Sequence, residues 1–208
     1  MILKEKEKEL ISKEIENLEK KSSVELVAVV TKRSSDYKLA SSMIAIFLLF
    51  CISCGLVFFE NISTFELVQI QVLIFFGFYL FFEKFKNSFF KLLPKSYKYQ
   101  IASENANKQF YNLQFDKTKH AIMFFVSFDE KYVEIITDKN ISEIIPNTHW
   151  KFIIDEFIND IKEEKVFEGY LRAIQACSSI LIKEFPIQEN DKNELPNEVI
   201  ELIWKKYY

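Results

Sequence analysis

Glycine and histidine are scarce in this chain of 208 residues, which holds three glycines and two histidines. Gly55 and Gly77 fall inside long apolar runs, so Gly169 alone is left for turns. Loops that cradle the phosphates of dinucleotides or nucleoside triphosphates need several glycines, because their backbone takes up positive φ or approaches the phosphate closely. Both classes of nucleotide-binding site are therefore excluded. With only His120 and His149, the sequence also excludes a zinc site made of three histidines.

An excess of positive charge is also missing. The chain has 27 Lys and Arg against 30 Asp and Glu, a formal net charge of −3. Proteins that bind nucleic acid through its phosphates carry a basic excess, so no nucleic-acid partner is expected. Of the three cysteines, Cys51 and Cys54 lie in an uncharged apolar run, where small residues serve helix packing rather than redox or metal chemistry. Cys177 falls on the apolar stripe of a predicted helix.

Two long apolar runs are the strongest feature present. Leu39 to Phe59 is free of charge and, as a helix, is about 31 Å long, enough to cross a bilayer core of about 30 Å. Leu67 to Phe82 is about 24 Å long as a helix, and Phe65 and Phe85 can extend it. The alternative is a pair of buried helices in a soluble protein, but the first run is too long for an ordinary amphipathic helix. The sequence predicts a transmembrane hairpin in the lipid bilayer.

The flanking charges predict its orientation. The linker Glu60 to Glu66 carries two Glu and no basic residue, whereas lysines cluster outside both runs. By the positive-inside rule, both termini are expected on the cytoplasmic side of the inner (cytoplasmic) membrane. The lysine- and phenylalanine-rich stretch Glu83 to Leu93 is either a basic amphipathic segment on the membrane surface or a continuation of the second span.

The remaining chain reads as alternating helices and strands. The Val24–Thr31 run is β-branched and apolar, and the runs His120–Ser127 and Tyr132–Asp138 are joined by four residues, as in an antiparallel hairpin. Helices are predicted over Met1–Lys21, Ala102–Phe115, Pro146–Lys165 and Phe167–Phe185, with a short closing helix over Val199–Trp204. The expected fold class is α/β: a small mixed sheet sandwiched by helices and interrupted by the two-helix transmembrane hairpin. The expected boundaries are 1–38 for the first helix and strand, 39–82 for the hairpin, 83–101 for a juxtamembrane segment, 102–187 for the main α/β part and 188–208 for the tail.

Acidic residues around the strand hairpin are the only constellation that suggests chemistry. Glu134 shares one strand face with Tyr132 and Ile136, so its carboxylate needs a partner or a cleft. Asp138 ends the same strand, about 13 Å from Glu134, and strand ends are where α/β sheets form ligand crevices. The alternative is structural: Asp129 and Glu130 as turn residues, Asp138 as a helix N-cap and Glu134 facing solvent.

The stretch His120 to Ile141, HAIMFFVSFDEKYVEIITDKNI, resembles the core hairpin of the TPM domain family, often called the TPM phosphatase domain. The resemblance extends through Trp150, Phe167–Tyr170, Ala173–Cys177, Glu184–Pro186 and Asn193–Pro196, and back to Ile11–Val30. It implies an α/β sandwich at a membrane, and it matches a bacterial subgroup with two central transmembrane spans. Ala121 and Asn140 stand where the family has glycine; Asn140 is expected to keep a left-handed turn, because Asn tolerates that conformation.

The resemblance implies two functions. Some relatives are described as assembly or repair factors. Together with the predicted membrane anchor and the lack of a compact catalytic cluster in the sequence, this favours a membrane-anchored binding or assembly module for a membrane protein complex. Others are described as acid phosphatases, and Glu130, Glu134 and Asp138 match the acidic positions of the family's hairpin. In that alternative the catalysis is metal-assisted, with Asp138 and neighbouring carboxylates holding Ca²⁺ or Mg²⁺ and water completing the coordination shell.

Overall fold

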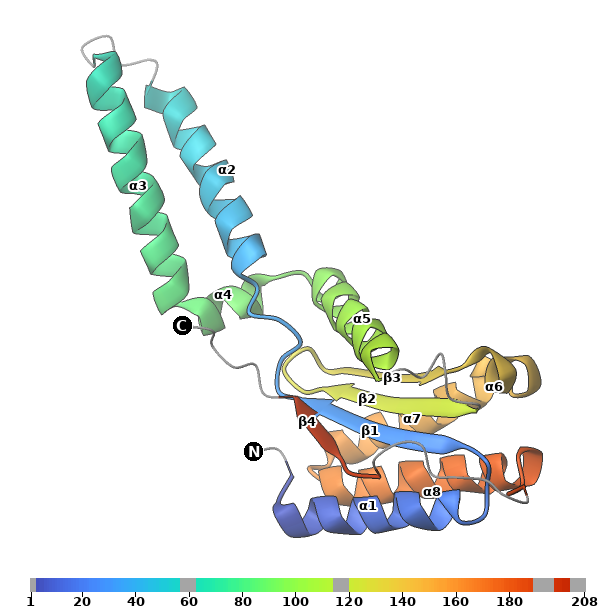
Figure 1. Ribbon diagram of the computed structural model, residues 1–208. Helices are drawn as coiled ribbons and strands as arrows, with labels where there is room; N and C mark the ends of the chain where they lie inside the picture. The colour runs from blue at the N-terminus through green and yellow to red at the C-terminus, as the bar shows by residue number, and fades with distance from the viewer. Residues whose placement is uncertain (1–2, 57–62, 114–119, 189–196, 203–208) are drawn as a thin grey trace. The chain divides into compact units, whose positions relative to one another are not determined.

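The computed structural model describes residues 3–56, 63–113, 120–188 and 197–202 (Figure 1). These residues form two compact units, one from residues 36–98 and one from the chain on either side of it. The second unit contains a mixed sheet with its covering helices, and the first contains the two long apolar helices. The predicted α/β fold class is confirmed.

The sheet has four strands in the order β3-β2-β1-β4 (Figure 1). The central strands β1 (Glu25–Thr31) and β2 (Ala121–Ser127) are parallel, with Glu25 opposite Ala121 and Thr31 opposite Ser127. The edge strand β3 (Tyr132–Thr137) returns antiparallel to β2, as the four-residue connection predicts. Every residue of β1 and β2 is buried, because helices cover both faces of a pair of strands that is nearly all apolar.

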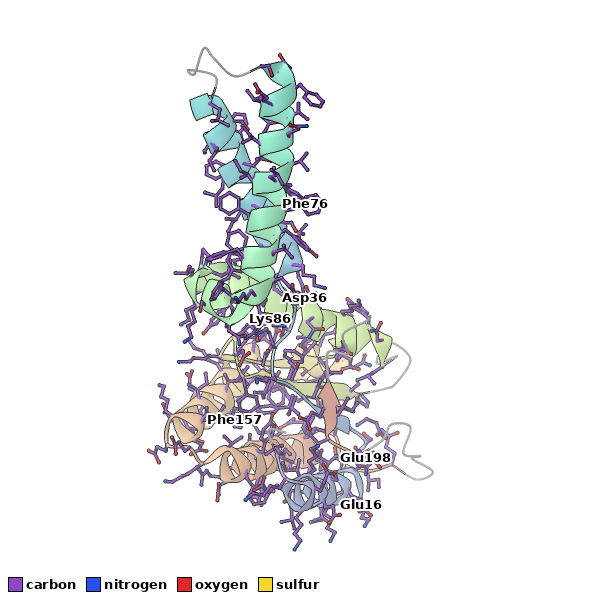
Figure 2. All side chains as sticks on the ribbon, turned by 90° about the vertical axis from the view of Figure 1, so that its left-hand side faces the viewer. Glu16, Asp36, Phe76, Lys86, Phe157 and Glu198 are labelled. Carbon is purple, nitrogen blue, oxygen red and sulfur yellow. The ribbon has the colours of Figure 1, made fainter. Side chains whose placement is uncertain are left out.

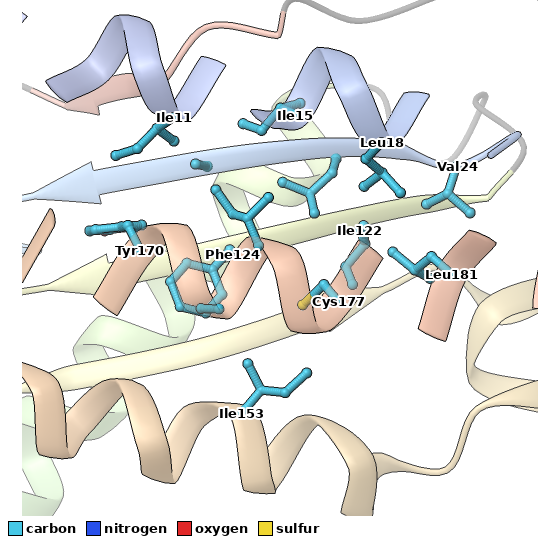
Figure 3. Close-up of a cluster of buried hydrophobic side chains, with 14 of the residues drawn as sticks. Ile11, Ile15, Leu18, Val24, Ile122, Phe124, Ile153, Tyr170, Cys177 and Leu181 are labelled. Carbon is cyan, nitrogen blue, oxygen red and sulfur yellow. The ribbon is translucent and has the colours of Figure 1, made fainter. Parts of the chain in front are cut away.

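Alternating side chains divide the core between the two faces of the sheet. Three helices cover one face: α1 (Glu5–Glu19), α7 (Asn147–Lys162) and α8 (Val166–Glu184). Their apolar stripes meet Leu26, Ala28, Val30, Ile122, Phe124 and Val126, as Figure 3 shows for part of this cluster. The C-terminal part of α5 (Lys95–Asn112) covers the other face, where Ala106 and Phe110 pack against Val27, Val29, Met123 and Phe125. The helices α1, α7 and α8 lie within a few residues of their predicted limits, whereas α5 begins at Lys95, seven residues before the predicted Ala102.

Gly169 explains how α7 and α8 pack so closely. A Cβ at Gly169 would lie 2.9 Å from Cβ of Asp160 and 3.1 Å from Cδ2 of Phe157, both on α7. The close approach lets Phe157, Tyr170 and Phe124 form an edge-to-face cluster, with ring centroids 4.8–5.5 Å apart. The single glycine outside the apolar runs is therefore used for helix packing and not for a turn.

The predicted closing helix at Val199–Trp204 is wrong over its described part. Ile200–Leu202 form a strand, β4, parallel to the end of β1, and residues 203 and 204 lie outside the described residues. Pairing with β1 decides the conformation: Ile200 and Leu202 pack on the α5 face, while Glu201 on the other face meets Lys8 of α1 at 2.6 Å. Three residues are too few for periodicity to distinguish a strand from a helix.

The unit of residues 36–98 contains α2 (Lys38–Leu56), α3 (Thr64–Lys84) and α4 (Lys86–Leu92). Both α2 and α3 are long and apolar enough to cross a membrane, and only 11% and 0% of their most apolar windows are buried in this structure. Figure 2 shows side chains such as Phe76 projecting from α3. The amide of Gln71 on α3 donates to the hydroxyl of Ser53 on α2 at 2.9 Å, which ties the pair together.

The second apolar helix does not continue to Leu93. It ends at Lys84, the backbone turns at Phe85 (φ −104°, ψ 27°), and α4 begins as a separate helix at Lys86. Phe85 therefore separates the long apolar helix from the lysine-rich segment that follows it.

Candidate functional site

The parallel strands β1 and β2 end side by side at Thr31 and Ser127, and the two loops that follow form a buried polar cluster. The hydroxyl of Ser127 donates to Oε2 of Glu130 at 2.5 Å, and the hydroxyl of Ser34 donates to Oγ of Ser127 at 2.8 Å. The backbone N–H of Ser34 donates to Oε1 of Glu130 at 3.0 Å. Glu130 is only 3% exposed, so these hydrogen bonds replace the water that its carboxylate loses. We refer to Ser34, Ser127 and Glu130 as the serine–glutamate cluster.

An ion pair joins the same two loops beside this cluster. Nε and Nη2 of Arg33 both lie 2.8 Å from Oδ2 of Asp129. Backbone bonds also join the loops, since N–H of Phe128 donates to the carbonyl of Thr31 and N–H of Asp129 donates to that of Lys32. The carboxyl end of the parallel pair therefore brings together the Arg33 guanidinium, the carboxylates of Asp129 and Glu130, and the hydroxyls of Ser34 and Ser127. This is the end of the sheet where open α/β folds bind ligands.

Glu134 lies in the middle of β3, on the face that α5 covers. Its Oε2 accepts hydrogen bonds from the hydroxyl of Tyr132 at 2.7 Å and from that of Ser103 at 3.3 Å. Burial raises the pKa of the Glu134 carboxyl above its usual value, against the lowering effect of these two bonds. Burial likewise raises the pKa of Tyr132 far above its ordinary range. The carboxylate of Glu134, which lies between two apolar residues on its strand face, is therefore stabilised by two hydroxyl donors.

Asp138 is the N-cap of the short helix α6 (Lys139–Ile144). Its Oδ1 accepts from N–H of Ile141 at 2.9 Å, and its Oδ2 accepts from N–H of His120 at 3.0 Å and from the amide of Asn140 at 3.2 Å. The side chain thus ties the start of β2 to the start of α6. Because N–H groups surround it, the arrangement does not fit Mg²⁺ or Ca²⁺, which need oxygen ligands.

The expectation of a left-handed conformation at Asn140 is wrong. Asn140 is the second residue of α6, and the positive φ angles of non-glycine residues belong to Tyr37, His120, Lys131 and Glu164. Its side chain acts instead, as a donor to Asp138.

The structure does not bring Glu130, Glu134 and Asp138 together. Glu130 lies at the carboxyl end of β2 and Asp138 at its amino end, and a strand of that length spans about 20 Å. Among the described ranges, no group of three or more His, Cys, Asp or Glu side chains is placed to hold a metal ion. The sequence did not predict Ser34 and Arg33 as part of this site. Only the parallel pairing of β1 with β2 places them beside Ser127.

A second pair of carboxylates, also not predicted, lies near the amino end of β1. Oε1 of Glu19 on α1 accepts from N–H of Leu26 at 3.3 Å. Burial, and then repulsion from Glu25, raise the pKa of Glu19 to about 8. This carboxyl is therefore largely protonated at neutral pH in the folded chain.

The architecture defines an α/β domain whose two central parallel strands are separated in sequence by a pair of long apolar helices. Residues 87–180 match the family model described as the TPM domain, which confirms the resemblance found in the sequence. This part of the chain is similar to the TPM domain family. The NMR structure of the BA42 protein from the psychrophilic bacterium Bizionia argentinensis has a similar fold, with a TM-score of 0.59 and 18% identity over 96% of this chain and 94% of that chain. No curated protein matches the chain.

Proposed function

We propose that the chain is a membrane-anchored TPM-domain protein that acts as a binding or assembly module in a membrane protein complex, with both termini on the cytoplasmic side. The observation that carries this proposal is a groove on α3. Ile74, Gly77, Phe78 and Phe81 line a hollow of about 360 Å³, and a Cβ at Gly77 would meet no atom within 4 Å. Spacing of i, i+3, i+4 and i+7 puts these four residues on one helix face. Small residues let transmembrane helices approach closely, so the groove fits a helix of a partner membrane protein.

A photo-reactive benzoylphenylalanine at position 74, in the full chain in its native membrane, is expected to cross-link to a discrete second membrane protein. The same group at Phe76, about half a turn away on α3, is the matched control and is expected to label lipid. Filling the groove with Gly77→Leu is expected to reduce the adduct about tenfold, since overpacking costs about 1–3 kcal/mol. Gly55→Leu on α2 is expected to leave the yield unchanged. Equal labelling from positions 74 and 76, or an adduct insensitive to Gly77→Leu, would contradict the proposal.

An acid phosphatase is the second candidate, and the serine–glutamate cluster favours it. A carboxylate at 2.5 Å from a serine hydroxyl is placed to take the proton of that hydroxyl as its oxygen attacks phosphorus. The ester P–O bond then breaks, the leaving alcohol is released with a proton, and water hydrolyses the phosphoserine to free phosphate. The neighbouring Arg33 guanidinium is of the type that binds phosphate oxygens. Because Ser127 is fully buried, a substrate has to displace the covering loops to reach it.

If this second candidate holds, Ser127→Ala and Glu130→Gln are expected to lower the release of phosphate from an aryl phosphate by about 100-fold or more. The assay uses the full chain in lipid nanodiscs, with EDTA, Mg²⁺ or Ca²⁺, so that any need for a metal is measured directly. Release that is absent, or that is equal in wild type and both variants, excludes this site as a phosphatase centre.

A further inference from the structure

We propose that a pocket between the β2–β3 hairpin and α7 binds a small amphiphilic anion, which is a molecule with an apolar chain and a carboxylate or phosphate head. The pocket lies between the carboxyl end of β2, the hairpin turn, the start of β3 and the C-terminal end of α7. Its volume is about 320 Å³, within the range of small-molecule sites in proteins. Its lining combines apolar side chains of these elements with Lys131, Lys162 and the edge of the buried Ser127, which also belongs to the serine–glutamate cluster. The inference concerns a different surface from the groove on α3.

The walls of the pocket are apolar. Val126 and Val133 face the α7 side of the sheet, and Phe128, from the turn, packs against the same core cluster. On α7, Trp150, Ile153 and Phe157 are fully covered by the sheet and by α8, but Ile158 and Ile161 at the end of the helix are only half-buried. These apolar side chains lack contacts on one side, and an apolar ligand would supply the missing dispersion contacts.

Two lysines supply the charge. Lys131 lies in the hairpin turn with φ 54°, and Lys162 lies in the last turn of α7, where its ammonium group donates to the Asn159 amide oxygen at 3.3 Å. Both side chains are exposed, and none of the ion pairs among the described residues includes either of them.

The acidic residues next to the pocket in sequence have partners of their own. Glu130 accepts hydrogen bonds from Ser127 and Ser34, and Glu134 accepts them from Tyr132 and Ser103. Asp129 pairs with Arg33, Glu163 pairs with Lys165, and Asp160 pairs with Arg172. Glu164 lines a different hollow, beside Lys4. No carboxylate lines this pocket, so the two ammonium groups beside it favour an anion. Apolar walls combined with a positive edge are complementary to a fatty-acid-like or alkyl-phosphate molecule rather than to inorganic phosphate alone.

The test is binding of decyl phosphate to the full chain in nanodiscs of zwitterionic lipid, followed by methyl NMR of Ile158 and Ile161. Saturable shifts of these methyl groups are expected, with decanol binding about tenfold more weakly and inorganic phosphate producing no shift. The exposed double variant Lys131→Glu/Lys162→Glu is expected to weaken binding about tenfold or more. Lys151→Glu, also exposed and on α7 but outside the pocket, is the matched control and is expected to bind as wild type does.

Nanodiscs that contain phosphatidylglycerol distinguish two sources of such a ligand. Displacement of decyl phosphate by this lipid assigns the site to a bilayer lipid, whereas no displacement assigns it to a soluble amphiphile. The proposal is overturned if the methyl groups do not shift, or if the double variant and wild type bind decyl phosphate equally. Neither result bears on the helix partner of the α3 groove, because the α3 cross-link is measured separately.

Discussion

Replacement of Asp138 by alanine is expected to lower the free energy of unfolding of the α/β unit by about 2–4 kcal/mol. The carboxylate caps α6 through Ile141 and also accepts the N–H of His120 at the start of β2. Alanine removes both acceptors at once and leaves two part-buried backbone donors without a partner. Asp138→Asn keeps one acceptor oxygen and places an amide N–H₂ where the other was, so its loss is expected to be smaller, about 1–2 kcal/mol.

Urea unfolding followed by tryptophan fluorescence measures this loss, because Trp150 lies in the core of the α/β unit and is 2% exposed. The control is Glu143→Ala, which removes only an exposed ion pair with Lys139 on the same short helix and is expected to cost less than about 0.5 kcal/mol. An Asp138→Ala variant as stable as wild type would show that the cap contributes nothing to the fold. Loss of any activity in an Asp138 variant is informative only beside this stability measurement.

Raising the pH from about 5 to 8 is expected to destabilise the folded chain through Glu19. Its pKa is about 8 when folded, against an ordinary value of 4.5. The folded state therefore holds a proton that the unfolded chain releases. The stabilisation is complete below about pH 4.5 and is lost as the pH rises through 8. Glu19 is only partly buried, so solvent screening reduces the loss to roughly 1–3 kcal/mol.

Glu19→Gln keeps the shape of the neutral carboxyl and is expected to make the stability less dependent on pH, with the largest gain over wild type near pH 8. Urea midpoints between pH 5 and 8 provide the measurement. Glu16→Gln is the control on the same helix. The Glu16 carboxyl is exposed and its pKa is lowered by Lys20, so replacing it is not expected to reduce the fall in stability between pH 5 and 8. A residual slope of the same sign is expected from Glu134, whose pKa is also raised. Parallel pH profiles for wild type and Glu19→Gln would refute the role of Glu19.

Periodicity in the sequence predicted most of the helices and strands, because each has an apolar stripe or an apolar run long enough to distinguish a helix from a strand. It could not predict β4, whose three residues take their conformation from pairing with β1. The serine–glutamate cluster also could not be predicted from the sequence. Ser34 and Ser127 are 93 positions apart, and only the parallel pairing of β1 and β2 brings them within hydrogen-bond distance.

The candidate carboxylates illustrate the same limit. Alternation along β3 correctly put Glu134 on one face with Tyr132, whose hydroxyl became its partner. Spacing alone could not tell which end of the hairpin adjoins the carboxyl ends of the parallel strands, since that depends on how β2 pairs with a strand far away in sequence. The structure places Glu130 at that end and Asp138 at the other.

The connection between β1 and β2 has a consequence for the order of events during synthesis. Residues 32–120 separate the two strands, and this connection contains both α2 and α3. At about 5–20 residues per second, β2 leaves the ribosome roughly 4–18 s after β1. Throughout that interval β1 has no central partner, and both apolar helices are made before β2 appears. In a chain anchored as proposed, α2 and α3 are therefore available to the bilayer before the sheet closes, so the α/β unit completes its folding only after both helices have been made.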